Sequence, residues 1–62
     1  MIEIIIEQWS GPDGTTFRWS LWRDGSRVGM GPEYPSAEEA ETIATGYCAK
    51  ALGVKPDRVT RL

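Results

Sequence analysis

The sequence predicts one α+β domain over residues 1–62, in which a helix covers one face of a small sheet. Phe17, Trp19 and Leu21 alternate with Arg18, Ser20 and Trp22 at the two-residue period of a half-buried strand. Asp24-Gly25 is a typical type I′ hairpin turn, because Asp tolerates and Gly freely adopts the positive φ required. The expected elements are an antiparallel meander over residues 1–9, 15–23 and 26–31, a helix over 37–52 and a short C-terminal strand over 58–62.

The first strand is predicted from isoleucines that recur at every second position. Side chains of Ile2, Ile4 and Ile6 point to one face, which is the better core face. The opposite face carries Glu3, Ile5, Glu7 and Trp9. Pro12 and the glycines around it then predict a loop of about four residues before the second strand.

The strand register of each hairpin can be derived separately, and the two registers agree on which side chains of the shared strand are buried. If Ser10 lies opposite Thr15, the pairs are Ile6 with Trp19, Ile4 with Leu21 and Glu7 with Arg18. If Arg23 lies opposite Ser26, the pairs are Leu21 with Val28, Trp19 with Met30 and Trp22 with Arg27. Both registers bury Trp19 and Leu21, which favours a meander. The predicted core face comprises Ile2, Ile4, Ile6, Phe17, Trp19, Leu21, Val28 and Met30.

The helix is predicted to follow a connection that contains Pro32 and Pro35. Ser36 and Glu39 have the spacing of a capping box, and Gly53 is the expected residue after the helix. Small residues dominate its narrow apolar face, which comprises Ala37, Ala40, Ile43, Ala44, Tyr47, Cys48, Ala51 and Leu52. The C-terminal strand is expected at an edge of the sheet, and the sequence leaves open which edge.

Composition restricts the functions that the chain can have. The 62 residues carry a net charge of −2, which argues mildly against general nucleic-acid binding. A domain of this size is expected to be marginally stable or to oligomerise. With one cysteine and no histidine, neither an intramolecular disulfide nor a Cys/His zinc site is possible. The short apolar run 4–6 resembles neither a signal peptide nor a membrane span, and we expect a cytoplasmic protein that does not contact membranes.

No group of residues indicates catalysis, a metal or a cofactor. Cys48 has no histidine partner and is interpreted as a buried structural thiol. Glu38, Glu39 and Glu41 point in different directions on a helix, so capping and solubility explain them better than a bound cation. Gly46, in the middle of the helix, marks either a close backbone contact or a tolerated surface position. We therefore expect the protein not to be an enzyme.

The sheet surface that the helix leaves open is the more informative feature. The predicted registers place on it Glu3, Ile5, Glu7, Trp9, Arg18, Ser20, Trp22 and Arg27. Tryptophan and arginine are enriched at the energetic centres of interfaces, and an exposed apolar patch is seldom left unused. The alternative is that Trp22 stacks under Arg27 while the C-terminal tail covers Trp9. A third reading is a surface that stacks single-stranded nucleic acid, which Glu3 and Glu7 disfavour.

Two resemblances add to this reading. Phe17-Arg18-Trp19-x-Leu21, the turn at Asp24-Gly25 and Gly31-x-x-Tyr34-x-Ser36 before the helix resemble the YegP-like ββα domains. That family implies no defined activity, and the first strand and the tail after Gly53 depart from its pattern. As a small, acidic, enzyme-free domain, the chain is also similar in kind to phage and mobile-element accessory proteins of the anti-CRISPR type. This resemblance implies stoichiometric binding to a CRISPR effector, with carboxylates standing in for DNA phosphates.

The functional hypothesis is accordingly a non-enzymatic, phage-type inhibitor that occludes the DNA-binding surface of a larger protein or ribonucleoprotein. Candidate partner-binding residues are Glu3, Glu7, Trp9, Arg18, Trp22, Arg27, Glu33, Glu38, Glu39 and Glu41, with Asp13 and Asp24 as further phosphate stand-ins. We expect a monomer or weak homodimer that does not itself bind nucleic acid. The alternatives are a single-stranded nucleic-acid-binding module that uses Trp9 and Trp22, or a YegP-like domain of undefined role.

Overall fold

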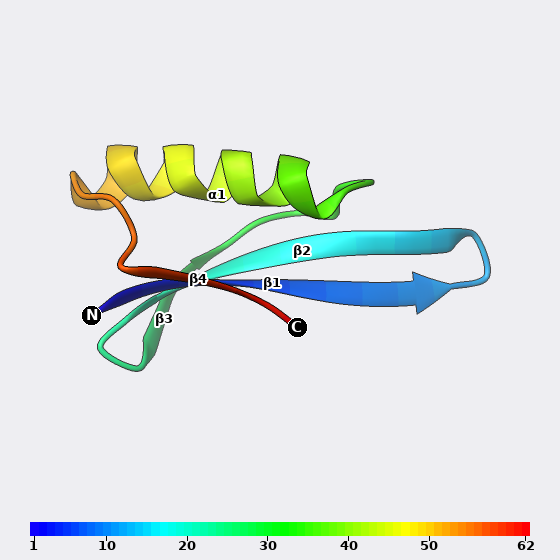
Figure 1. The fold of residues 1–62 in the computed structure, drawn as a ribbon, viewed down its shortest axis with the longest axis horizontal. Coiled ribbons are helices and arrows are strands. Elements are labelled where there is room, and N and C mark those ends of the chain that lie inside the picture. Colours follow the sequence, from blue (N-terminus) through cyan, green and yellow to red (C-terminus); the bar gives the residue numbers. More distant parts are fainter.

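A computed structural model describes all residues 1–62 and shows one helix packed on a four-stranded sheet (Figure 1). The elements are β1 (Ile2–Gly11), β2 (Gly14–Arg23), β3 (Ser26–Met30), α1 (Ala37–Leu52) and β4 (Arg58–Arg61). The strand order is β3-β2-β1-β4, with β1 to β3 antiparallel and β4 parallel to β1. The predicted α+β class, meander, helix limits and C-terminal strand are therefore confirmed, and the strand ends shift by at most two residues.

The hairpin of β1 and β2 has the predicted register. Ile6 pairs with Trp19, Glu7 with Arg18, and Ser10 with Thr15. The connecting loop is shorter than predicted, because the ladder continues to the pair of Gly11 and Gly14. Gly14 has a φ of 119°, which a residue with a side chain rarely adopts, so glycine at this position lets β2 begin directly after a two-residue turn.

The hairpin of β2 and β3 has the predicted turn, but its strand register differs from the prediction farther from the turn. Asp24 and Gly25 have φ of 48° and 84°, as a type I′ turn requires, and Trp22 pairs with Arg27. A bulge at Leu21 and Trp22 then shifts the register, so that Leu21 pairs with Gly29 and Ser20 with Met30. The predicted pairs of Leu21 with Val28 and Trp19 with Met30 are wrong. The two apolar residues, Val28 and Met30, are 43% and 57% exposed and lie outside the core.

The bulge follows from the space that two aromatic rings occupy beside β3. The rings of Trp19 and Tyr47 pack with their centroids 5.1 Å apart. A Cβ atom at Gly29 would lie 2.9 Å from Tyr47 Cε1, and one at Gly31 would lie 2.0 Å from Trp19 Nε1. Only glycine fits at Gly31, because the Trp19 ring is buried, whereas a side chain at Gly29 would have to displace the exposed Tyr47 ring. The shifted register places both glycines beside the rings and leaves Val28 and Met30 exposed.

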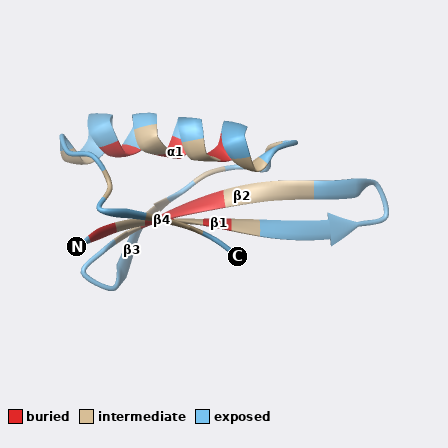
Figure 2. Ribbon diagram, in the orientation of Figure 1, coloured by how far each residue is buried: buried red, intermediate tan, exposed pale blue.

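The core lies between α1 and the sheet, at the N-terminal half of β1 and the C-terminal half of β2 (Figure 2). Its members are Ile2, Ile4, Ile6, Trp19, Leu21, Ala40, Ala44 and Cys48. Phe17, expected in the core, is only partly buried against it. The apolar face of α1 is narrower than predicted, because Ile43, Tyr47 and Ala51 are exposed. Small side chains at the remaining positions let the helix approach the isoleucines closely.

The ends of α1 have the predicted caps. Ser36 Oγ accepts a hydrogen bond from the Glu39 amide at 3.2 Å, and Gly53, with a φ of 70°, donates its N–H to the Ala49 carbonyl at 3.0 Å. Near this end Cys48 is buried, as predicted, and its Sγ lies 3.2 Å from the Val54 carbonyl oxygen. Burial raises the pKa of the Cys48 thiol, and the negative charge of Asp57 raises it further. The thiol therefore remains protonated at neutral pH.

β4 lies at the β1 edge of the sheet, whereas the sequence left open which edge the C-terminal strand would join. The Asp57 carboxylate accepts the Ile2 amide at 2.7 Å, and the Asp57 amide donates to the Ile2 carbonyl at 2.8 Å. Farther along, the Leu62 amide donates to the Ile6 carbonyl at 2.9 Å. These bonds begin and end the parallel pairing, so β4 covers only residues 3–6 of β1.

The hairpin of β1 and β2 is longer than the helix that covers it. Ten residues of strand extend roughly 33 Å, whereas the sixteen residues of α1 extend roughly 24 Å. The far end of the hairpin therefore continues beyond α1, as Figure 1 shows. Trp9 lies near this end of β1 and is 52% exposed.

Candidate binding surface

The side of the sheet opposite α1 is not covered by any other element, and we call it the outer sheet face. Strand alternation and the observed registers place on it Glu3, Ile5, Glu7, Trp9, Thr16, Arg18, Ser20, Trp22, Arg27, Met30, Arg58 and Thr60. All eight residues predicted for this surface are therefore on it. Ser20 is buried on this face, and its Oγ accepts a hydrogen bond from the Trp22 indole N–H at 2.8 Å. Ile5 and Trp22 are half-buried.

Trp9 and Arg18 form the distal part of the outer sheet face. The guanidinium carbon of Arg18 lies 5.4 Å from the centroid of the Trp9 ring, within the range of a cation–π contact. Arg18 also donates to the carboxylate of Glu33, which reaches this face from the connection before α1. The C-terminal tail does not cover Trp9, because β4 pairs with β1 only as far as Ile6. The large exposed ring of Trp9 is thus held in place by its neighbours and open to a partner.

Glu3 anchors β4 to the centre of the face. Its Oε2 accepts hydrogen bonds from Arg58 Nε at 2.9 Å and from Thr60 Oγ1 at 2.8 Å. These two donors, Arg58 first and Thr60 second, hold the pKa of the Glu3 carboxyl below its ordinary value. The carboxylate is therefore ionised at neutral pH, although its side chain is only 19% exposed.

We expect Glu3 to make stability depend on pH in a way that Glu3→Gln removes. Because the folded state lowers the pKa, the stabilisation is complete above the ordinary glutamate pKa of 4.5 and disappears as pH falls through the folded value. Urea unfolding at neutral pH should show the wild type to be more stable than Glu3→Gln. At pH values below the folded pKa of Glu3, where the carboxyl is protonated in both the folded and the unfolded chain, the difference should largely vanish. A difference that stays constant with pH contradicts this assignment.

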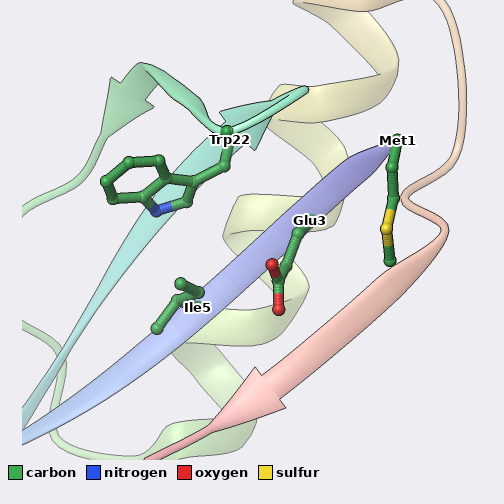
Figure 3. Close-up of a pocket in the computed structure, with 5 residues that line it drawn as sticks. Met1, Glu3, Ile5 and Trp22 are labelled. Atoms are coloured by element: carbon green, nitrogen blue, oxygen red, sulfur yellow. The ribbon is translucent and has the colours of Figure 1, made fainter.

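A hollow of about 160 Å³ lies between Trp22 and the start of β1 (Figure 3). Its lining consists of Met1, Glu3, Ile5, Trp22 and Gly25. Figure 3 shows the Glu3 carboxylate between the side chains of Ile5 and Met1, with the Trp22 ring to one side. Three of the five lining residues are hydrophobic, so the hollow combines apolar walls with one charged group.

The predicted acidic residues do not form one surface. Glu38 and Glu39 are exposed in the first turn of α1, on the other side of the sheet from Glu3 and Glu7. Glu41 pairs with Arg61 at 3.0 Å, and Asp24 pairs with the amino group of Met1. Asp13 lies in the distal turn between β1 and β2. Intramolecular ion pairs thus engage Glu3, Glu33, Glu41 and Asp24, and leave Glu7, Asp13, Glu38 and Glu39 without one.

The sequence reasoning missed four residues of the outer sheet face, which are Thr16, Met30, Arg58 and Thr60. Arg58 and Thr60 alternate with Val59, which indicated a shared face but not the neighbouring strand. Met30 was assigned to the core, and the bulge places it opposite Ser20 on the outer face instead. The glycines on either side of Met30 were the available signal, since glycine within a strand often marks a bulge or a close approach.

Fold and surface together define a small α+β domain with one sheet face covered by a helix and the other open. Comparison with protein-family models, with curated proteins and with solved structures finds no match to this chain. Its single helix, α1, lacks the length and the apolar character needed to cross a membrane.

Proposed function

We propose that the protein is a non-enzymatic inhibitor that binds a larger nucleic-acid-handling protein stoichiometrically and docks on it through the outer sheet face. The observation that carries the proposal is the gathering of Trp9, Trp22 and Met30 with Arg18 and Arg27 on an open sheet surface. Tryptophan, methionine and arginine are the residue types enriched in the buried centres of protein interfaces.

The charges of this face favour a protein partner over a nucleic acid. Its acidic side chains are Glu3 and Glu7, to which Glu33 is added from the connection before α1 through its pair with Arg18. Its basic side chains are Arg18, Arg27 and Arg58. The two signs balance, whereas binding to a phosphate backbone relies on a basic excess. A balanced face with aromatic anchors suits a partner that also presents apolar groups and both charges.

The class of partner rests on the resemblance to anti-CRISPR-type accessory proteins, and a CRISPR effector is the most concrete candidate. The structure supplies a reason to prefer the outer sheet face over phosphate mimicry as the means of binding. Of the carboxylates expected to imitate phosphates, Glu3, Glu33 and Glu41 already have arginine partners in the same chain. The carboxylates without an ion pair are Glu7, Asp13, Glu38 and Glu39. They are divided between the outer sheet face, the distal turn and the helix start, so they do not form one acidic surface.

A second candidate function is the binding of single-stranded nucleic acid on the same face. The specific observation in its favour is Trp9, an exposed ring beside the cation of Arg18, because bases stack on such aromatic platforms. This function predicts binding to oligonucleotides at low salt and its loss at high salt. Stoichiometric inhibition of a protein predicts no oligonucleotide binding under either condition.

The proposed function is tested with the wild type and two surface variants. Affinity capture from host lysate identifies the partner, and the purified partner is then titrated by calorimetry. The double variant Trp9→Ala, Arg27→Glu should weaken binding at least about tenfold, because interface anchors typically contribute more than ~1.4 kcal/mol. Reversal of Glu38 and Glu39 to lysine should leave affinity nearly unchanged. Glu41 is kept, because its pair with Arg61 holds β4 to α1.

Each outcome decides between the candidates. Loss of binding in the glutamate-reversed variant, but not in the double variant, would establish acidic mimicry and contradict docking through the sheet. Capture of no partner, together with oligonucleotide binding that Trp9→Ala abolishes, would establish the nucleic-acid-binding function instead. Far-ultraviolet circular dichroism of every variant controls for unfolding.

A further inference from the structure

We propose that the hollow beside Trp22 binds a basic side chain, lysine or arginine, of the partner protein. The proposal deepens the proposed function and rests on it, because it assumes that a protein docks on the outer sheet face. It identifies one anchoring contact within that face by the chemistry of the group that occupies it.

The size of the hollow fits one long side chain. Pockets for drug-sized ligands occupy roughly 300–1,000 Å³, whereas this one has about 160 Å³. A cavity of about 150 Å³ holds one benzene molecule, which approaches the bulk of a lysine side chain. Met1, Ile5 and Trp22 provide apolar walls along which a four-carbon stem can lie.

The second carboxylate oxygen of Glu3, which Arg58 does not contact, favours a cationic donor at the end of that stem. Glu3 is ionised, its side chain is 19% exposed, and both of its hydrogen bonds are made through Oε2. Oε1 has no hydrogen-bond partner within the chain. An apolar group in the hollow would remove water from this oxygen without replacing its hydrogen bonds, and an acidic group would be repelled. A lysine or arginine would donate to Oε1 while its stem contacts the walls.

Arg58 does not occupy the hollow or donate a hydrogen bond to Glu3 Oε1. Its Nε donates to Oε2, and Arg58 is not among the residues that line the hollow. The ion pair therefore orients the carboxylate from the β4 side and leaves its second oxygen for a ligand. Basic side chains are abundant on surfaces that bind nucleic acids, which links this hollow to the proposed class of partner.

The proposal is tested with short peptides, independently of any partner. Acetyl-Gly-Lys-Gly-amide, its arginine counterpart and its norleucine counterpart are titrated at millimolar concentration into the isotope-labelled full chain. The Trp22 indole N–H and the Ile5 methyl groups report occupancy of the hollow in NMR spectra. We expect both basic peptides to shift these signals to saturation and the norleucine peptide to bind about tenfold more weakly.

Two variants of β1 separate the pocket from general electrostatic attraction. Glu3→Gln keeps the shape of the hollow and should weaken binding of the lysine peptide about tenfold. Glu7→Gln removes a charge of the same face outside the hollow and should leave binding unchanged. Equal binding of the norleucine and lysine peptides, an equal effect of both variants, or no shift at Trp22 would overturn the proposal.

Failure of this proposal is distinguishable from failure of the proposed function. If the peptides do not bind while Trp9→Ala, Arg27→Glu still weakens the partner complex, the outer sheet face docks the partner without this anchor. If the peptides bind as expected and no protein partner is captured, the hollow recognises basic side chains and the inhibitory function is wrong.

Discussion

Replacing Trp19 with alanine is expected to lower the free energy of unfolding by about 3–5 kcal/mol. Trp19 is 4% exposed, pairs with Ile6 and packs against Tyr47, so it joins β1, β2 and α1. Its indole N–H has no hydrogen-bond partner, and the loss is therefore one of packing. A chain of 62 residues has a total stability of roughly 3–9 kcal/mol, so the Trp19→Ala substitution should remove a large part of it and lower the melting temperature markedly.

Trp9→Ala is the matched control for this substitution. The same change is made on the neighbouring strand at a ring that is 52% exposed, where the expected loss is below ~1 kcal/mol. Thermal unfolding followed by circular dichroism measures both variants. An unchanged melting temperature for Trp19→Ala, or equal effects of the two substitutions, would contradict the core assignment.

Replacing Gly31 with alanine is expected to destabilise the protein by about 3 kcal/mol, the upper end of the range for an overfilled core. The added Cβ would lie 2.0 Å from Trp19 Nε1 and 2.2 Å from Cε2. The ring cannot move away, because it is buried between the sheet and Tyr47. Gly31 must shift instead, which breaks the hydrogen bond from its amide to the Trp19 carbonyl.

Gly46→Ala has the opposite expected sign and serves as the control. A Cβ at this mid-helix position meets no atom within 4 Å, so Gly46 is a tolerated surface residue rather than the mark of a close contact. Alanine there should stabilise the protein by about 1 kcal/mol through its higher helix propensity. Urea unfolding of both variants provides the measurement, and a Gly31→Ala protein as stable as the wild type would show that the bulge does not depend on the missing side chain.

Features set by neighbouring residues could be predicted from the sequence. The caps at Ser36 and Gly53 limit α1 because local hydrogen bonds and a positive φ satisfy the helix ends whatever surrounds them. The turn at Asp24 and Gly25 likewise fixes the start of its hairpin. Along β1 and β2 a one-residue slip would turn a row of isoleucines outward, so the burial pattern alone selected the correct register.

The composition of the candidate surface could be predicted only in part. Alternation on β1 and β2 placed Trp9, Trp22 and Arg18 on one face, since it depends only on the period of a strand. It could not show which arginine would pair with which carboxylate, because Arg18, Arg58 and Arg61 find partners 15, 55 and 20 residues away in the chain. The hollow beside Trp22 was equally hidden from the sequence, since its walls come from separate strands.

By itself the sequence determined the elements, their limits and the register of the longest hairpin, because each depends on local backbone preferences or on a period that one strand carries. Only the tertiary structure decided the bulge in β3, beside which the buried ring of Trp19 excludes a side chain at Gly31 and the ring of Tyr47 closely approaches Gly29. It also decided that β4 pairs with β1 and which carboxylates have arginine partners in the chain. These outcomes depend on competition for space and for charge partners between distant residues, which no short stretch of the chain contains.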